Sequence, residues 1–161
     1  MKSVAILLLG FLLTGQQPAP GAVESTFDKK TNFGAVKTYA WTRGTNAFAP
    51  DVHKMIVAAI EKEMAALGLT PAASGADVTL AYYSMALVNV DLKALDKIDE
   101  KSALATKDLG KLVVVMRNKA NEQIWSAQSR EFLDPDRTKL EATVNTVTAR
   151  LFATYPTRAQ K

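Results

Sequence analysis

His53 is the side chain in this sequence best suited to general base chemistry near neutral pH, and it is the only histidine among 161 residues. With carboxylates beside it, a histidine can activate a nucleophile or a water molecule, and Asp51 lies close by in the sequence. His53 falls in the first turn of a predicted helix, on or near its polar side, where an exposed histidine is the ordinary outcome. A hydrolase that uses His53 with nearby carboxylates is therefore the alternative hypothesis, with no catalytic residue assigned.

Other residues and motifs that are typical of enzymes do not occur in the sequence. It contains no cysteine, which excludes thiolate nucleophiles, disulfides and cysteine-ligated zinc or iron–sulfur sites. One histidine also excludes metal sites that need two or three histidine ligands. The phosphate-binding pattern GxxxxGK[ST], the dinucleotide pattern GxGxxG and the hydrolase pattern GxSxG do not occur. We expect no cofactor and no metal, and a non-enzymatic domain is favoured.

The segment Asp91–Gly110 has the densest charge in the chain, with acidic and basic residues mixed. The spacing of Asp91, Asp96 and Asp99 is reminiscent of a calcium loop, but such a loop needs oxygen ligands at alternate positions and a central glycine. Lysines lie among these carboxylates instead. We interpret the segment as a solvated, mobile loop that can include a short surface helix. The apolar residues spaced for that helix are Leu92, Leu95 and Ile98.

Large apolar side chains supply the candidate surface for a ligand or partner. Its members are Tyr83, Met85, Trp41 and Trp125. Tyr83 and Met85 are expected on the face of a sheet that the helices leave open. The two tryptophans lie in predicted strands, where large aromatic residues more often belong to the core than to a ligand pocket.

The hydrophobic pattern predicts five strands and two helices. The strands are Val23–Phe27, Val36–Trp41, Asp77–Val90, Lys111–Asn118 and Glu122–Phe132, and the helices are Pro50–Leu67 and Asp136–Thr154. The first helix begins with a proline and ends before Gly68, which indicates a Schellman stop. The last two strands flank a short polar turn and should form an antiparallel hairpin.

These elements predict an α+β fold. We expect a two-layer sandwich, with a mainly antiparallel sheet of four to five strands and both helices on one face. The strand Val36–Trp41, the helix Pro50–Leu67 and the strand Asp77–Val90 form a βαβ unit, so the two strands of this unit can be parallel.

The N-terminus has the layout of a secretory signal peptide. Lys2 precedes an apolar stretch from Val4 to Leu13, and a segment of small and polar residues follows. About ten apolar residues rise only about 15 Å as a helix, which is half of a bilayer core. We therefore predict a signal peptide over residues 1–21, with cleavage after Gly21 or Ala22, and a single domain over residues 22–161.

Composition is typical of one globular domain with its own core, because 48% of the residues are hydrophobic and 22% are charged. The net charge is only +4, and the basic residues are scattered among 16 acidic ones. This weak basic excess gives little support to nucleic-acid binding. After the N-terminal stretch, no uncharged apolar run is long enough for a stable membrane span.

Several short motifs occur in a recognisable order over roughly residues 23–156. They are Lys37-Thr38-Tyr39-Ala40-Trp41, Ala66-Leu67-Gly68-Leu69, Ala76-Asp77-Val78, Ile124-Trp125-Ser126 and Tyr155-Pro156. In this order the chain resembles the bacterial envelope family called domain of unknown function 4136. The resemblance implies a secreted or lipid-anchored α+β domain with no established reaction and no catalytic residues to carry over.

One position departs from the lipoproteins of that family. Leu13-Thr14-Gly15 looks like the approach to a lipobox, but Gln16 stands where the lipidated cysteine would be. Without a thiol no thioether lipid can form, so we expect a soluble periplasmic or secreted protein. The favoured function is a non-enzymatic envelope module that binds a protein, a lipid or a cell-wall component through the open sheet face or its edge.

Overall fold

The structure, a computed structural model, describes residues 19–87, 109–134 and 136–159. These residues form an α+β fold with a six-stranded mixed sheet and three α-helices. The strands are β1 (Val23–Phe27), β2 (Thr38–Trp41), β3 (Thr70–Pro71), β4 (Val78–Leu87), β5 (Leu109–Arg117) and β6 (Gln123–Phe132). The helices are α1 (Pro50–Ala66), α2 (Arg137–Ala153) and α3 (Pro156–Ala159), with a 3-10 turn η1 at Phe33–Ala35.

The sheet has the strand order β1-β6-β5-β4-β2-β3. The neighbouring pairs β1–β6, β6–β5 and β5–β4 are antiparallel. Strand β2 is parallel to both β4 and β3. The predicted hairpin and the predicted parallel pair are therefore confirmed. The expected count of four to five mainly antiparallel strands is wrong, because Thr70–Pro71 adds a sixth strand at the parallel edge. A strand of two residues is too short to show any alternation of polar and apolar side chains.

Both long helices begin and end where local chemistry dictates. Pro50 opens α1, and Gly68 follows its end with a φ of +78°, a conformation that glycine adopts without steric cost. The Leu69 N–H donates to the Met64 carbonyl and the Gly68 N–H to the Ala65 carbonyl, which completes the predicted Schellman motif. Helix α2 is capped by Asp136, whose side chain accepts from the Thr138 N–H.

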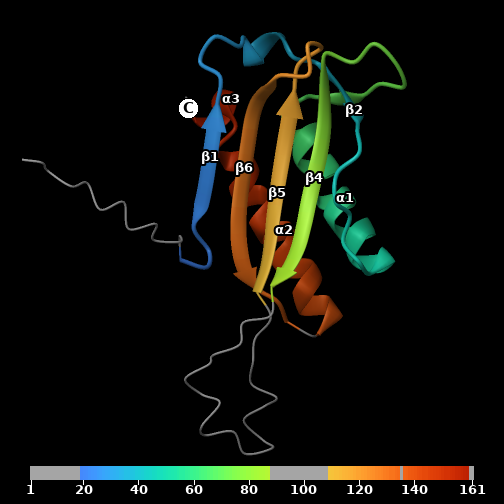
Figure 1. Ribbon diagram of the computed structural model, residues 1–161, viewed down its shortest axis with the longest axis vertical. Helices are drawn as coiled ribbons and strands as arrows, with labels where there is room; N and C mark the ends of the chain where they lie inside the picture. Colours follow the sequence, from blue (N-terminus) through green and yellow to red (C-terminus); the bar gives the residue numbers. More distant parts are fainter. Residues whose placement is uncertain (1–18, 88–108, 135, 160–161) are drawn as a thin grey trace, which may run out of the picture.

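The helices cover one face of the sheet only, and Figure 1 looks onto the other face, with α1 and α2 behind the strands. The core lies between the two layers, where the apolar stripe of α2 meets the strands. Every residue predicted for that stripe is buried: Leu140, Val144, Val147, Leu151 and Tyr155. In the part of the chain that the structure describes, no helix is long and apolar enough to cross a membrane.

Only the end of the charged segment between β4 and β5 lies within the described residues. Leu109 and Gly110, expected in the loop, belong to β5, where they pair with Leu87 and Ala86 of β4. The rest of the predicted loop and its short helix, and Val90 at the predicted end of the strand, fall within residues 88–108, outside the described residues.

Residues around the predicted cleavage site are tied to the domain. The Gly21 N–H donates to the Arg130 carbonyl, and the Gly21 carbonyl accepts from Arg150 Nη1 at 3.0 Å. The next carbonyl, that of Ala22, accepts from Ser129 Oγ at 2.9 Å. Strand β6 and helix α2 therefore hold the chain just ahead of β1.

Candidate ligand-binding cavity

A cavity of about 1180 Å³ lies between the helix layer and the sheet. It is at the end of the sheet where β4 and β6 finish and where both α1 and α2 begin. The strands β4, β5 and β6 form its floor, the first turns of the two helices form its roof, and the loop that precedes α1 forms a side wall.

The cavity exists because the side chains on the helix-facing side of the sheet become small toward this end. Residues paired directly across strands share a face. Far from the cavity, one such row is Leu80, Met116 and Trp125, all large and fully buried. Nearer the cavity the rows become Ser84, Leu112 and Ser129, then Ala86, Gly110 and Glu131. The small residues leave space beneath the helices that larger side chains would fill.

The roof of the cavity is aliphatic. Val52 and Ile56 come from the first two turns of α1, at positions four residues apart on one helix face. Helix α2 adds Leu140, Val144 and Val147, which repeat on its sheet-facing side. The same periodicity that builds the core therefore supplies the apolar surface of the cavity.

The side wall is the loop between β2 and α1, which follows β4 closely. The Thr45 N–H donates to the Tyr82 carbonyl, and the Ser84 N–H donates to the Thr45 carbonyl. Gly44 allows this approach, because a Cβ built there would lie 1.9 Å from the Tyr82 carbonyl oxygen. Beyond it Phe48, a fully exposed aromatic residue, lines the cavity.

Tyr82 fixes this wall through its hydroxyl group. The Ala47 N–H donates to Tyr82 Oη at 3.2 Å, and His53 Nδ1 is hydrogen-bonded to the same oxygen. The rings of His53 and Tyr82 are stacked with centroids 5.8 Å apart. Burial raises the pKa of the Tyr82 hydroxyl. The hydroxyl group therefore stays protonated and links the loop to α1.

His53 is thus placed differently from the exposed position expected for it. It is half-buried against Tyr82 and does not line the cavity. The neighbouring carboxylate of Asp51 forms an ion pair with Arg137 at 3.2 Å, which joins the first turns of α1 and α2. Within the described residues, no group of histidine and acidic side chains is arranged to hold a metal ion.

Two polar side chains in the cavity lining are engaged with the protein. Ser129 donates to the Ala22 carbonyl, and Glu131 is paired with Arg150. Arg150 in turn donates to the Gly21 carbonyl, so this part of the floor is connected to the N-terminal segment.

The four residues of the candidate surface do not form one surface. Trp125 faces the helices and is fully buried, with its ring 5.2 Å from that of Phe152. Trp41 lies on the same side of the sheet, is 37% exposed and donates to Glu61 of α1. Tyr83 and Met85 alternate with the buried positions of β4, so Tyr83 points to the open face. Met85, which is 44% exposed, is also one of the residues that line the large cavity. Trp125 is therefore core, and the four residues lie on both faces of the sheet.

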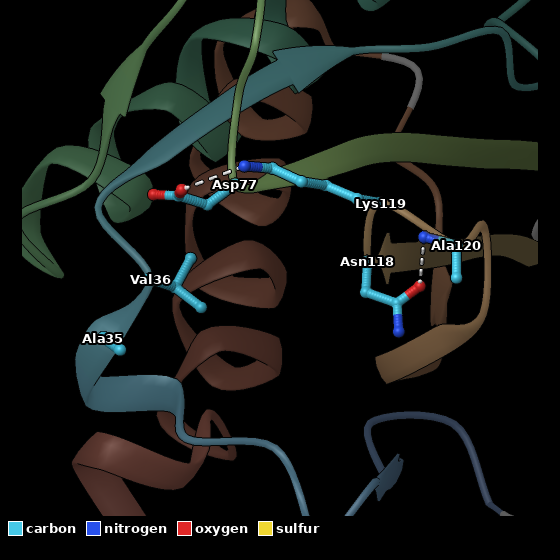
Figure 2. A pocket seen from close by; sticks show the side chains of 6 residues that line it. All are labelled: Ala35, Val36, Asp77, Asn118, Lys119 and Ala120. Atoms are coloured by element: carbon cyan, nitrogen blue, oxygen red, sulfur yellow. Dashed lines mark hydrogen bonds and ion pairs between the residues drawn. The ribbon is translucent and has the colours of Figure 1, made fainter.

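A smaller and shallower cavity of about 380 Å³ lies at the opposite end of the sheet. Figure 2 shows the Lys119 side chain reaching toward Asp77, at an Nζ–Oδ1 distance of 3.8 Å. Asp77 Oδ2 accepts from the backbone N–H groups of Lys37 and Thr38 and from the Thr38 hydroxyl. These bonds fasten the start of β2 to the start of β4. The Asp77 carboxylate is thus already bonded to groups of the protein. For this reason we do not take this cavity as the candidate site.

The larger cavity was not predicted from the sequence. The signal that could have revealed it is the change to small residues at alternate positions near the strand ends, at Ser84, Ala86 and Gly110. That signal needs the strand register, which the sequence alone does not supply.

Comparisons with solved structures support the fold. A PDZ domain protein from Parabacteroides distasonis ATCC 8503 superposes with a TM-score of 0.62 at 17% identity, over 83% of this chain and 35% of that one. This chain therefore spans about a third of that protein. The PelC dodecamer from Paraburkholderia phytofirmans gives a TM-score of 0.56 at 10% identity, over 82% of this chain and 94% of that one. At these identities the likeness shows the fold alone.

Sequence comparison assigns the family. A search of curated proteins gave no match. The family model described as "Domain of unknown function (DUF4136)" matches residues 23–157, which is nearly the whole chain. The chain therefore belongs to the DUF4136 family, as its motifs indicated.

Proposed function

We propose that the protein is a non-enzymatic binding module of the bacterial envelope that holds an apolar ligand in the cavity between α1, α2 and the sheet. The observation that carries this proposal is a cavity of about 1180 Å³ with an aliphatic roof. Sites for small molecules are commonly about 300–1,000 Å³ and mostly apolar, with few polar groups. The cavity lies just above that range, which suits a ligand with a large apolar part.

The envelope assignment rests on the N-terminal sequence. The pattern of Lys2 and the apolar stretch from Val4 to Leu13 supports export, and Gln16 in place of a lipobox cysteine supports an unlipidated product in the periplasm or the medium. In that compartment lipids and other envelope components are available as ligands.

The hydrolase hypothesis needs His53 and a carboxylate to converge on a cavity. His53 bonds to Tyr82 beside the loop, and Asp51 is paired with Arg137. With its histidine and its nearest carboxylate engaged elsewhere, that hypothesis has no geometric support, and we do not carry it further.

A second candidate function is protein contact through the open sheet face. Met85 is 44% exposed on that face beside Tyr83, which is half-buried, and Phe132 is 43% exposed on β6. The PelC structure is described as a dodecamer, which favours self-association among the protein partners considered. Light scattering after size exclusion tests it: Phe132→Lys, at a residue outside the cavity lining, should lower the mass of any oligomer, and a monomer at all concentrations contradicts it.

The binding function is tested with N-phenyl-1-naphthylamine, an uncharged probe that fluoresces in apolar surroundings. Thr143 lines the cavity on α2, whereas Thr146 is exposed one turn further along the helix. We expect saturable binding to the wild type, loss of binding in Thr143→Phe, which fills the cavity, and retained binding in Thr146→Phe. No saturable binding, or equal binding by both variants, would refute the proposed function.

A further inference from the structure

We propose that the ligand in this cavity is the linear hydrocarbon chain of an amphiphile. This inference rests on the proposed function and names its ligand class. The argument uses the chemistry of the lining, the state of its polar groups, the length of the cavity and the character of its mouth.

The lining is suited to methylene groups rather than to flat rings. Its roof consists of branched aliphatic side chains, among them Val52, Ile56, Val144 and Val147. Among the described lining residues, Phe48 is the only aromatic one, and it stands fully exposed. A planar aromatic ligand would gain apolar contacts in this lining but no ring stacking, because favourable ring pairs need a second π-system.

Two polar side chains of the floor already have partners within the protein. Ser129 donates to the Ala22 carbonyl, and Glu131 is paired with Arg150. A ligand group that hydrogen-bonds to either of these two side chains would have to break the existing bond, which is costly in a buried site. A hydrocarbon chain makes no such demand.

The length of the cavity matches an acyl chain. Its lining on α2 extends from Arg137 to Val147, which is a rise of about 15 Å along a helix. The hydrocarbon core of a bilayer is about 30 Å thick, so the chains of one leaflet span about 15 Å. The cavity is therefore about as long as one acyl chain in a membrane leaflet, and it can enclose one such chain.

Polar residues gather at the end of the cavity where the helices begin. Asn46, Asp134 and Arg137 are in the lining there, and the Arg137 side chain is 56% exposed. Phe48 extends from the same end into solvent. The head group of an amphiphile would stay in water at this mouth, with Phe48 covering the first part of the chain.

The test is competition against N-phenyl-1-naphthylamine by a series of linear fatty acids of increasing length, with cholate as a rigid apolar competitor. Burial of each additional CH₂ should tighten binding about fourfold, until the chain is longer than the cavity and the gain stops. Dodecanoyl lysophosphatidylcholine, used below its micelle concentration, shows whether a free acid or a lipid is the better source of the chain. Tight binding of either supports the inference.

Two variants make the result specific. Thr143→Phe should abolish direct binding of dodecanoate, measured by calorimetry because this variant also loses the probe, with Thr146→Phe as its matched control. Phe48→Ser tests the mouth without a risk to folding, because that ring is fully exposed, and it should weaken dodecanoate binding severalfold.

Cholate that competes as well as dodecanoate, or affinity that does not depend on chain length, would overturn the linear-chain inference while leaving an apolar binding site in place. If the probe itself fails to bind, both the inference and the proposed function fall.

Discussion

The Tyr82 hydroxyl joins the cavity wall to helix α1. Because its oxygen accepts from the Ala47 N–H, its own proton is available to His53 Nδ1, which then acts as acceptor. This assignment places the proton of neutral His53 on Nε2. One phenol thus satisfies a loop N–H and selects the histidine tautomer.

Replacing Tyr82 by phenylalanine should therefore destabilise the domain by about 1–3 kcal/mol, since it leaves the Ala47 N–H and His53 Nδ1 without partners. Denaturant unfolding measures the loss. Tyr83→Phe is the matched control, because Tyr83 lies next in β4 on the open face. Equal effects of the two substitutions would show that the hydrogen bonds of Tyr82 contribute nothing.

Trp125 offers a test of packing. Trp125→Ala should cost about 3–5 kcal/mol, because the ring is fully buried against Phe152 and Tyr155. Trp125→Phe should cost much less, since the indole N–H donates to no described group. Trp41→Ala, at a ring that is 37% exposed, should cost less than half as much as Trp125→Ala. A loss below about 1 kcal/mol for Trp125→Ala, measured by denaturant unfolding, would contradict its placement in the core.

At the scale of elements, one carboxylate fastens the parallel part of the sheet. Asp77 precedes β4, and its Oδ2 accepts from two backbone N–H groups and one hydroxyl group at the start of β2. The Lys37 N–H, followed by the bonds from Thr38, holds the pKa of Asp77 below its ordinary value. The charged form of Asp77 therefore favours the folded state.

The sign of the pH dependence follows from this shift. Because the pKa of Asp77 is lower in the folded protein, its stabilisation is present above the unfolded pKa of about 4 and is lost as the pH falls through the folded value. Asp77→Asn should be less stable than the wild type at pH 7, and the difference should shrink on acidification. Urea unfolding at several pH values measures it, and a constant difference down to low pH would contradict the role given to the charge.

The elements differ in how far sequence predicts them. The two long helices and the hairpin were predictable because apolar residues repeat at 3.6 or 2 residues along them and because Pro50, Gly68 and Asp136 mark the helix ends. The four-residue helix α3 was not predicted. Strand β3 was not, since two residues carry no period and Pro71 disfavours a strand. Local pattern thus specifies long elements, and pairing with β2 specifies the short one.

On the scale of the whole molecule, the candidate site depends on contacts between distant segments. Ser84, Gly110 and Leu140 line the same cavity from three different elements, and only the sheet register and the docking of α2 bring them together. The alternation of side chains along a strand was enough to place Tyr83 and Met85 on the face opposite the core. The sequence did not show whether a tryptophan in a strand belongs to the core or lines a pocket. The fold class was therefore accessible from the sequence, and the site was not.

Export makes a prediction for the whole chain. The mature protein should be found in the periplasmic or culture fraction and should begin near residue 22 or 23, because the N-terminal pattern predicts cleavage after Gly21 or Ala22. Intact-mass measurement decides it. A membrane-bound product that retains Met1 would show that the apolar stretch is an uncleaved anchor.

The central claim is that the cavity binds an apolar chain, and methyl NMR during titration with dodecanoate tests it most directly. Methyl groups of Ile56, Val144 and Val147 line the cavity, whereas Val113 lies on the open face of the sheet. The account predicts saturable shifts of the three cavity residues with Val113 unchanged. Shifts confined to Val113, or no saturable shift at any methyl group, would contradict it.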